Sequence, residues 1–154
     1  MHIALIEPEI PGNTGSIGRV CVGTGSTLHL VGKLGFSLDE RYVRRAGLDY
    51  WPKVQLRQHA DLNALLQALP DSTCHFFSAH GQLRYDQVVY GPDDLLIFGG
   101  ESRGLPAAVR LQWGPSLVYL PTTGDIRSLN LSNAVTAVVY EALRQQGFPG
   151  LGGA

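Results

Sequence analysis

Residues 95–106 read LLIFGGESRGLP, an apolar run that passes directly into a short glycine-containing loop with one carboxylate, Glu101. Because the apolar residues are continuous rather than alternating with polar ones, the run is typical of a strand covered on both faces, as in a parallel sheet flanked by helices. Open α/β sheets bind ligands at the carboxyl ends of their strands, where this loop lies. The local pattern leaves two interpretations of Glu101 open: a ligand contact, or a solvated acid capping the helix that Pro106 begins.

The same strand pattern recurs along the chain, and helical patterns separate the strands. The other apolar runs are residues 3–6, 28–31, 74–78 and 117–120. Leucines at helical spacing follow Asp61, a candidate N-cap, and stop at Pro70. A second apolar stripe runs from Leu131 to Leu143, with Gly147 placed to end that helix. Strands alternating with helices predict an α/β fold with a parallel sheet.

Length and composition limit the class of protein. The chain has 154 residues, 44% of them hydrophobic, so we expect a single domain over residues 1–154 with a frayed tail over 148–154. The start of the chain lacks a basic leader, and no run has membrane-spanning length, which predicts a cytoplasmic protein without a membrane partner. Cys21 and Cys74 lack metal-like spacing and are expected to be reduced packing residues. With a net charge of −1, any nucleic-acid site must be a local basic patch.

Two further turns follow predicted strands. The first, residues 11–19 (PGNTGSIGR), opens a helix whose glycines and free N–H groups suit a polar or anionic ligand. Its G-x-x-G-x-x-G spacing differs from the dinucleotide-binding G-x-G-x-x-G, and the chain lacks a P-loop pattern, so NAD and nucleotide-triphosphate sites are disfavoured. The second, residues 121–134, contains Ser128, Asn130 and Ser132. Only one of them can cap the final helix, and the surplus indicates ligand contacts.

Taken in chain order, these three turns resemble the motifs of the SPOUT RNA methyltransferases. Their Asn and the Arg six residues later are matched by Asn13 and Arg19, their G-x-E-x-x-G loop by Gly99, Glu101 and Gly104, and their S-x-N pair by Ser128 and Asn130. Within that class, residues 8–11 and 44–50 resemble the minimal wobble-nucleotide tRNA 2′-O-methyltransferases. One departure is Gly100, where the family pattern has Pro, and it removes no functional side chain.

The resemblance implies a fold, an assembly and a reaction. The fold would be a parallel sheet flanked by helices with a deep C-terminal trefoil knot, in a homodimer whose active site draws on both subunits. The reaction would be methyl transfer from S-adenosyl-L-methionine to the ribose 2′-hydroxyl of the wobble pyrimidine, nucleotide 34, mainly in leucine tRNAs, with S-adenosyl-L-homocysteine as product. Because the sulfonium is already activated, no metal is needed, and the protein must supply positioning and help with the hydroxyl proton.

The resemblance also implies site residues. The candidate catalytic residues are Arg19, Asn13, Glu101 and Asn130, and the candidate cofactor-binding residues are Phe77, Gly99, Leu120, Ile126 and Ser128. A guanidinium, with a pKa above about 12, is a poor base, so we favour stabilisation of developing negative charge by Arg19. Asn13 would orient Arg19 or the ribose. Glu101 would pair with Arg19 or face the cationic end of the cofactor, and the sequence does not choose between these.

The expected RNA contacts lie in a basic segment near aromatic residues. Its cations are Arg41, Arg44, Arg45, Lys53 and Arg57, close to Tyr42, Tyr50 and Trp51. Cations can position phosphates while aromatic rings stack on an unpaired base; the alternative is a solvated helix face. Tyr140 on the last helix is a further candidate for contact with RNA or the partner subunit, or for packing.

Two other functions stay open. One is a SPOUT methyltransferase acting on ribosomal RNA or another tRNA position, which the lack of accessory domains and the segment 44–50 disfavour. The other is a non-catalytic module that binds cofactor or RNA. Such a module has no evident need for all five motif side chains, which are those of Asn13, Arg19, Glu101, Ser128 and Asn130.

Overall fold

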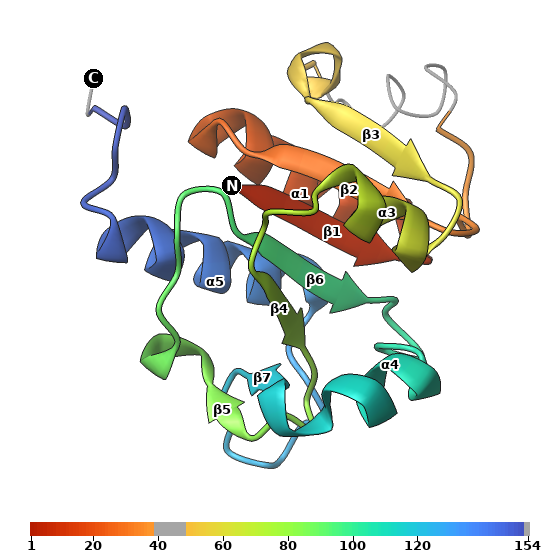
Figure 1. Ribbon diagram of the computed structural model, residues 1–154. Helices are drawn as coiled ribbons and strands as arrows, with labels where there is room; N and C mark the ends of the chain where they lie inside the picture. Colours follow the sequence, from red (N-terminus) through yellow and green to blue (C-terminus); the bar gives the residue numbers. More distant parts are fainter. Residues whose placement is uncertain (39–48, 153–154) are drawn as a thin grey trace.

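The computed structural model describes residues 1–38 and 49–152, and its centre is a seven-stranded parallel sheet (Figure 1). The strands are β1 His2–Ile6, β2 Thr27–Val31, β3 Leu56–His59, β4 Cys74–Phe77, β5 Leu83–Arg84, β6 Leu95–Gly99 and β7 Val118–Tyr119. Their spatial order is β3-β2-β1-β6-β4-β7-β5, and all neighbouring pairs are parallel. The predicted parallel sheet is confirmed.

Two of the strands lie outside the predicted apolar runs. β3 reads Leu-Arg-Gln-His and lies at one edge of the sheet, and β5, with two exposed residues, lies at the other. An edge strand is paired on one side only and need not be covered on both faces, so it lacks the continuous apolar pattern of an inner strand.

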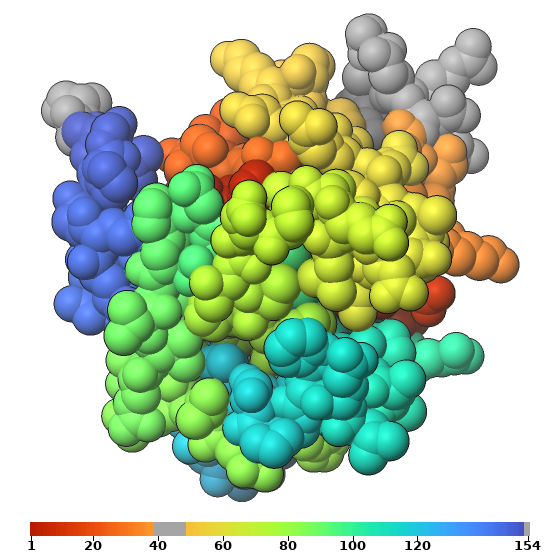
Figure 2. Space-filling view, viewed as in Figure 1, coloured from red at the N-terminus to blue at the C-terminus, as the bar shows by residue number. Residues whose placement is uncertain are grey.

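Helices cover both faces of the sheet. The helices are α1 Pro11–Thr24, α3 Leu62–Ala68, α4 Ala107–Trp113 and α5 Leu131–Gln145, with short 3-10 turns η1 Trp51–Lys53, η2 Tyr85–Gln87 and η3 Gly114–Ser116. α1 and α5 pack on one face, and α3 and α4 on the other (Figure 1). In the space-filling view, the layer nearer the reader hides most of β1 (Figure 2). Among the described residues, no helix is long and apolar enough to cross a membrane.

The inner strands are apolar on both sides because each face of the sheet has its own core. Along β1, Ile3 and Leu5 belong to the buried cluster under α1 and α5, whereas Ala4 and Ile6 belong to the cluster under α3 and α4. Successive side chains of a strand point to opposite faces, so both parities must be apolar when both faces are covered.

The predicted helix ends are confirmed at three places. The Asp61 side chain accepts a 2.8 Å hydrogen bond from Ala64 N and caps α3. Gly147 has a φ of 74° and follows the end of α5, a conformation that glycine adopts without steric cost. Of the three candidate caps before α5, Asn130 is the N-cap residue, since its side chain accepts from Ser132 N and Asn133 N.

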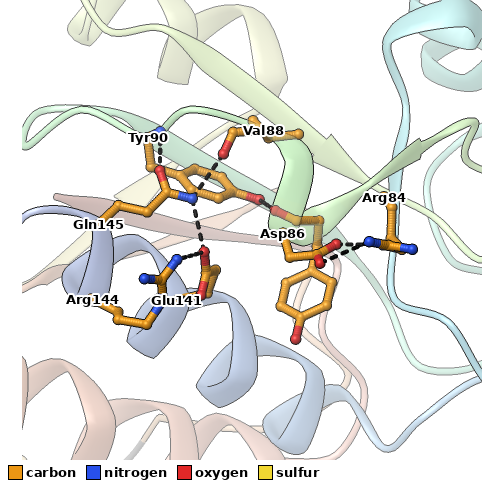
Figure 3. Close-up of polar contacts among 8 residues, drawn as sticks. Arg84, Asp86, Val88, Tyr90, Glu141, Arg144 and Gln145 are labelled. Atoms are coloured by element: carbon orange, nitrogen blue, oxygen red, sulfur yellow. Dashed lines mark hydrogen bonds and ion pairs between the residues drawn. The ribbon is translucent and has the colours of Figure 1, made fainter.

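The C-terminal end of α5 is fixed to the segment that leads into β6 (Figure 3). Gln145 accepts from Tyr90 N at 3.0 Å and donates to Val88 O at 2.9 Å, so its amide pairs with the backbone of that segment. Gln145 and Arg144 both donate to the Glu141 carboxylate, and these bonds lower the pKa of Glu141 to about 2. This network therefore holds α5 in place while its other end reaches the loops described next.

Candidate active site

The loops that follow β1, β4, β6 and β7 surround one cavity at the carboxyl edge of the sheet. Its volume is about 780 Å³. It is lined by residues 77–80, 98–105, 119–122 and 127–131, together with Ile10, Asn13, Arg110 and Ala134. Small-molecule sites occupy roughly 300–1,000 Å³ and combine apolar walls with a few polar groups, which fits this cavity. All three turns singled out in the sequence contribute to it.

The loop after β6 folds back on itself so tightly that glycine is required. Gly104 N donates a 2.8 Å hydrogen bond to Gly100 O, and Gly104 has a φ of 65°. A Cβ atom added to Gly99 would lie 1.9 Å from the Gly104 carbonyl carbon. The glycine spacing of this motif therefore follows from backbone contact within the loop.

A chain of side-chain hydrogen bonds joins one residue from each of the three turns. Asn130 Nδ2 donates to Asn13 Oδ1 at 3.0 Å, and Asn13 Nδ2 donates to Glu101 Oε1 at 3.0 Å. Asn13 is 8% exposed, so its amide is almost fully withdrawn from water and both its oxygen and its nitrogen are paired. Three of the four candidate catalytic residues are thus in direct contact at the wall of the cavity.

Glu101 also binds the backbone that precedes α1. Its carboxylate accepts from Glu9 N at 2.8 Å and from Ile10 N at 3.2 Å, in addition to the Asn13 amide. Among the described residues it forms no ion pair with Arg19. A carboxylate at this place is favourable because the start of a helix presents unpaired N–H groups and partial positive charge.

Arg19, the fourth candidate, does not line the cavity of its own chain. It is exposed on α1, and its guanidinium carbon lies 4.6 Å from the centroid of the Tyr50 ring. Six residues along a helix correspond to a rise of about 9 Å, which separates it from Asn13. The Tyr50 hydroxyl donates to Gly15 O at 2.6 Å and fixes the ring beneath Arg19. Partial burial raises the pKa of Tyr50, and the positive charge of Arg19 offsets part of this rise.

Four of the five candidate cofactor residues line the cavity. They are Phe77, Gly99, Leu120 and Ser128. The Phe77 ring is buried and stacks on Phe98 with centroids 4.5 Å apart, so it is both core and cavity wall. Ile126 is not among the lining residues and is 52% exposed.

The candidate RNA contacts are placed in part. Arg41, Arg44 and Arg45 lie outside the described residues. Tyr140 is 48% exposed on α5, away from the buried stripe of that helix.

Three arginines of the cavity lie outside the motif positions. Arg103 and Arg127 lie within and beside the motif loops, and Arg127 donates to Ser102 O at 3.4 Å. Arg110 lies on α4, and its Nε is buried without a hydrogen-bond partner among the described residues. The positions of Arg103 and Arg127 next to motif residues are the signal that could have indicated these two, whereas Arg110 has no such neighbour in the sequence. Within residues 1–38 and 49–152, no group of three or more His, Cys, Asp or Glu side chains is placed to hold a metal ion.

Comparison with known proteins gives consistent results. Residues 1–140 match the SpoU rRNA Methylase family. The chain is 46% identical over 152 residues to the tRNA (cytidine(34)-2'-O)-methyltransferase of Burkholderia pseudomallei (strain 1106a), with 97% of each chain covered. A structure solved for insights into the 2-OH methylation of C/U34 on tRNA is 43% identical, with a TM-score of 0.88 and 95% of each chain covered.

A more distant structure shares the fold with a cofactor bound. The SpoU methyltransferase AviRb from Streptomyces viridochromogenes, in complex with the cofactor AdoMet, is 25% identical with a TM-score of 0.81, and the match covers 95% of this chain and 57% of that one. Together with the family match over residues 1–140 and the glycine loop and Asn-Glu-Asn contacts of the cavity, these similarities show that the chain belongs to the SpoU rRNA methylase family.

Proposed function

We propose that this protein transfers a methyl group from S-adenosyl-L-methionine to the ribose 2′-hydroxyl of the wobble pyrimidine of tRNA, nucleotide 34, with leucine tRNAs as substrates. The observation that carries the proposal is the hydrogen-bonded chain Asn130–Asn13–Glu101, which joins the three motif loops at the wall of the cavity. The activities named for the 43–46% identical relatives support the choice of nucleotide 34.

The cavity fits S-adenosyl-L-methionine in size and in the character of its walls. The apolar side chains of Phe77 and Leu120 suit an adenine ring, and Ser128 and the backbone of the loop after Gly99 offer polar groups for the rest of the molecule. The AdoMet complex of AviRb supports this assignment. The cofactor supplies an activated methyl group, and the chain's own residues must hold it in line with the attacking oxygen.

Arg19 acts, in this proposal, at the cavity of a partner subunit. The support is its position: it is exposed and absent from the wall of its own cavity, although the motif pattern assigns it to catalysis. In a homodimer with shared active sites, its guanidinium would lie beside the ribose and stabilise the negative charge that develops on the 2′-oxygen as its proton leaves. The ring of Tyr50 would limit the directions in which Arg19 can point.

The RNA-binding surface is proposed to combine the basic segment with the rim of the cavity. Arg41, Arg44 and Arg45 would contact phosphates, with Tyr140 near the partner subunit or the RNA.

We also infer that the C-terminal part of the chain forms the trefoil knot. The support is that β7 pairs with β4 and β5, while α5, which follows β7, packs against α1 on the face of the sheet opposite to α4.

The test of this function is methyl transfer to tRNA with a matched variant. Purified protein is incubated with bulk tRNA and S-adenosyl-L-methionine labelled in its methyl group, and labelled nucleotides are mapped by nuclease digestion. Label on the 2′-oxygen of nucleotide 34, greatly reduced with Arg19→Ala, is the expected result. Label at another nucleotide, or none with a tRNA pool lacking this modification, would contradict the proposal.

A further inference from the structure

Glu9 lies on the turn between β1 and α1 and was not among the candidate site residues, yet its exposed carboxylate accepts hydrogen bonds from one residue of the cavity loop. Glu9 Oε1 accepts from Ser102 N at 3.0 Å and from Ser102 Oγ at 2.7 Å, and Glu9 Oε2 lies 2.7 Å from the same hydroxyl. Ser102 is at the tip of the loop between Gly99 and Gly104 that forms one wall of the cavity. Glu9 therefore binds the tip of that loop from outside the cavity.

Two glycines pack closely against the turn that carries Glu9. A Cβ added to Gly35 would lie 2.8 Å from Glu9 Cα, and a Cβ added to Gly100 would lie 3.0 Å from Glu9 Oε1 and 2.7 Å from Glu7 O. Gly35 N also donates to Pro8 O at 2.9 Å. Because the turn is packed between two glycines, the backbone at Glu9 lies close to the loop that carries Ser102.

The contact is reciprocal. Glu9 binds the N–H and hydroxyl of Ser102, while the preceding residue of that loop, Glu101, binds the N–H groups of Glu9 and Ile10. Each carboxylate thus satisfies donors on the opposite segment. Hydrogen bonds to charged acceptors are shorter and stronger than neutral ones. Two such sets fix the distance and the rotation between the turn before α1 and the cavity loop.

We propose that Glu9 is a positioning residue of this enzyme: through Ser102 it holds the loop of residues 99–104 in the shape that binds the cofactor. This rests on the proposed function for the identity of that cofactor. A glutamate carboxylate is ionised at neutral pH, and the hydrogen bonds from Ser102 lower the pKa of Glu9 further. Glu101 binds the turn before α1 at the start of the loop, and without Glu9 the tip at Ser102 would keep only the 3.4 Å bond from Arg127 to its carbonyl oxygen and the bond between Gly104 N and Gly100 O within the loop.

The experiment measures cofactor affinity and stability of four variants of the whole chain. Titration calorimetry with S-adenosyl-L-homocysteine gives Kd, and thermal unfolding gives Tm. Loss of hydrogen bonds to a charged group, discounted for solvent exposure, predicts that Glu9→Ala raises Kd about tenfold and Ser102→Ala about threefold. Glu9→Gln keeps one acceptor oxygen and should restore part of the affinity. Asp86→Ala removes a carboxylate that accepts from Arg84 outside the cavity and should leave Kd unchanged (Figure 3).

Two further readouts separate positioning from a general loss of folding. With tRNA as substrate, KM for S-adenosyl-L-methionine should rise by the same factor as Kd while kcat changes by less than about twofold. The double variant Glu9→Ala with Ser102→Ala should bind no more weakly than Glu9→Ala alone, because both act through one contact.

Three outcomes would overturn the role of Glu9. They are a Kd for Glu9→Ala within twofold of wild type, additive losses in the double variant, or a Kd change that follows Tm across all variants. If Glu9→Ala fails to fold, an unchanged Kd in Ser102→Ala overturns it as well. A wild-type protein that bound no S-adenosyl-L-homocysteine would overturn the proposed function too, whereas wild-type binding with unaffected variants would overturn the positioning role alone.

Discussion

Asn130 performs two tasks that a pair of substitutions can separate. Its Oδ1 caps α5 by accepting from Ser132 N at 2.9 Å, and its Nδ2 donates to Asn13 Oδ1 at 3.0 Å. Asn130→Ala removes both. A lost N-cap costs about 1 kcal/mol and a lost side-chain hydrogen bond about 1 kcal/mol, so the free energy of unfolding should fall by about 2 kcal/mol. Asn130→Ser keeps a capping oxygen but cannot reach Asn13, and the loss should be about 1 kcal/mol.

The two variants should therefore differ in stability but not in activity. For a chain of this length, 1 kcal/mol corresponds to about 2–4 °C, so Tm should fall by about 4–8 °C in Asn130→Ala and by about half as much in Asn130→Ser. Both lose the bond that orients Asn13, and both should lose methyl transfer to tRNA to the same extent, measured as kcat/KM at a temperature where both are folded. Full activity in Asn130→Ser would refute a role of Asn130 in the site beyond capping, and equal Tm values would refute the cap.

Three further predictions concern the histidines, the glycine loop and the dimer. Buried His29 lies 3.1 Å from His2 and 2.9 Å from His59, ring nitrogen to ring nitrogen, and burial lowers its pKa from 6.5 to about 3. Because the folded-state pKa of His29 is depressed, the contribution of the neutral ring to the free energy of unfolding is complete above pH 6.5 and is lost as pH falls toward 3. Unfolding by urea at pH 5.0 should show a loss of about 2 kcal/mol relative to pH 7.5 that His29→Leu lacks. Gly99→Ala should abolish binding of S-adenosyl-L-homocysteine, whereas Gly12→Ala, whose Cβ would meet nothing within 4 Å, should bind normally; equal binding would contradict the loop geometry. Arg19→Ala and Glu101→Ala proteins, each inactive alone, should regain about one quarter of wild-type activity when mixed 1:1 and allowed to exchange subunits. Half of the resulting dimers then contain one subunit of each kind, and each of these mixed dimers has one intact site out of two; no recovery would contradict a shared site.

The sequence indicated the inner part of the sheet but not its edges. The five inner strands β1, β2, β4, β6 and β7 could be predicted because burial on both faces requires continuous apolar residues. β3 and β5 lie at the edges and contain polar side chains such as Arg57 and Arg84, so they resemble loops when only the pattern is considered.

The site could be predicted as three loops, but not the contacts between them. Asn13, Glu101 and Asn130 meet because β6 pairs directly with β1. Asn13 and Glu101 are 88 residues apart along the chain, and no local pattern contains the strand pairing that joins them. Arg19 is separated from these residues by helix geometry, which the motif spacing alone does not reveal. Glu9 was not singled out for a site role, since its importance comes from two glycines and a serine that the fold brings to it.

The most direct test of the proposed reaction compares two full-length leucine tRNAs that differ by one oxygen. One carries cytidine at nucleotide 34 and the other carries 2′-deoxycytidine there, and each is incubated with the protein and S-adenosyl-L-methionine before mass spectrometry of the nuclease fragments. We predict a gain of one methyl group on the anticodon fragment of the ribose-containing tRNA and no gain on the deoxy form. Equal methylation of both tRNAs, or methylation of another fragment, would contradict the account.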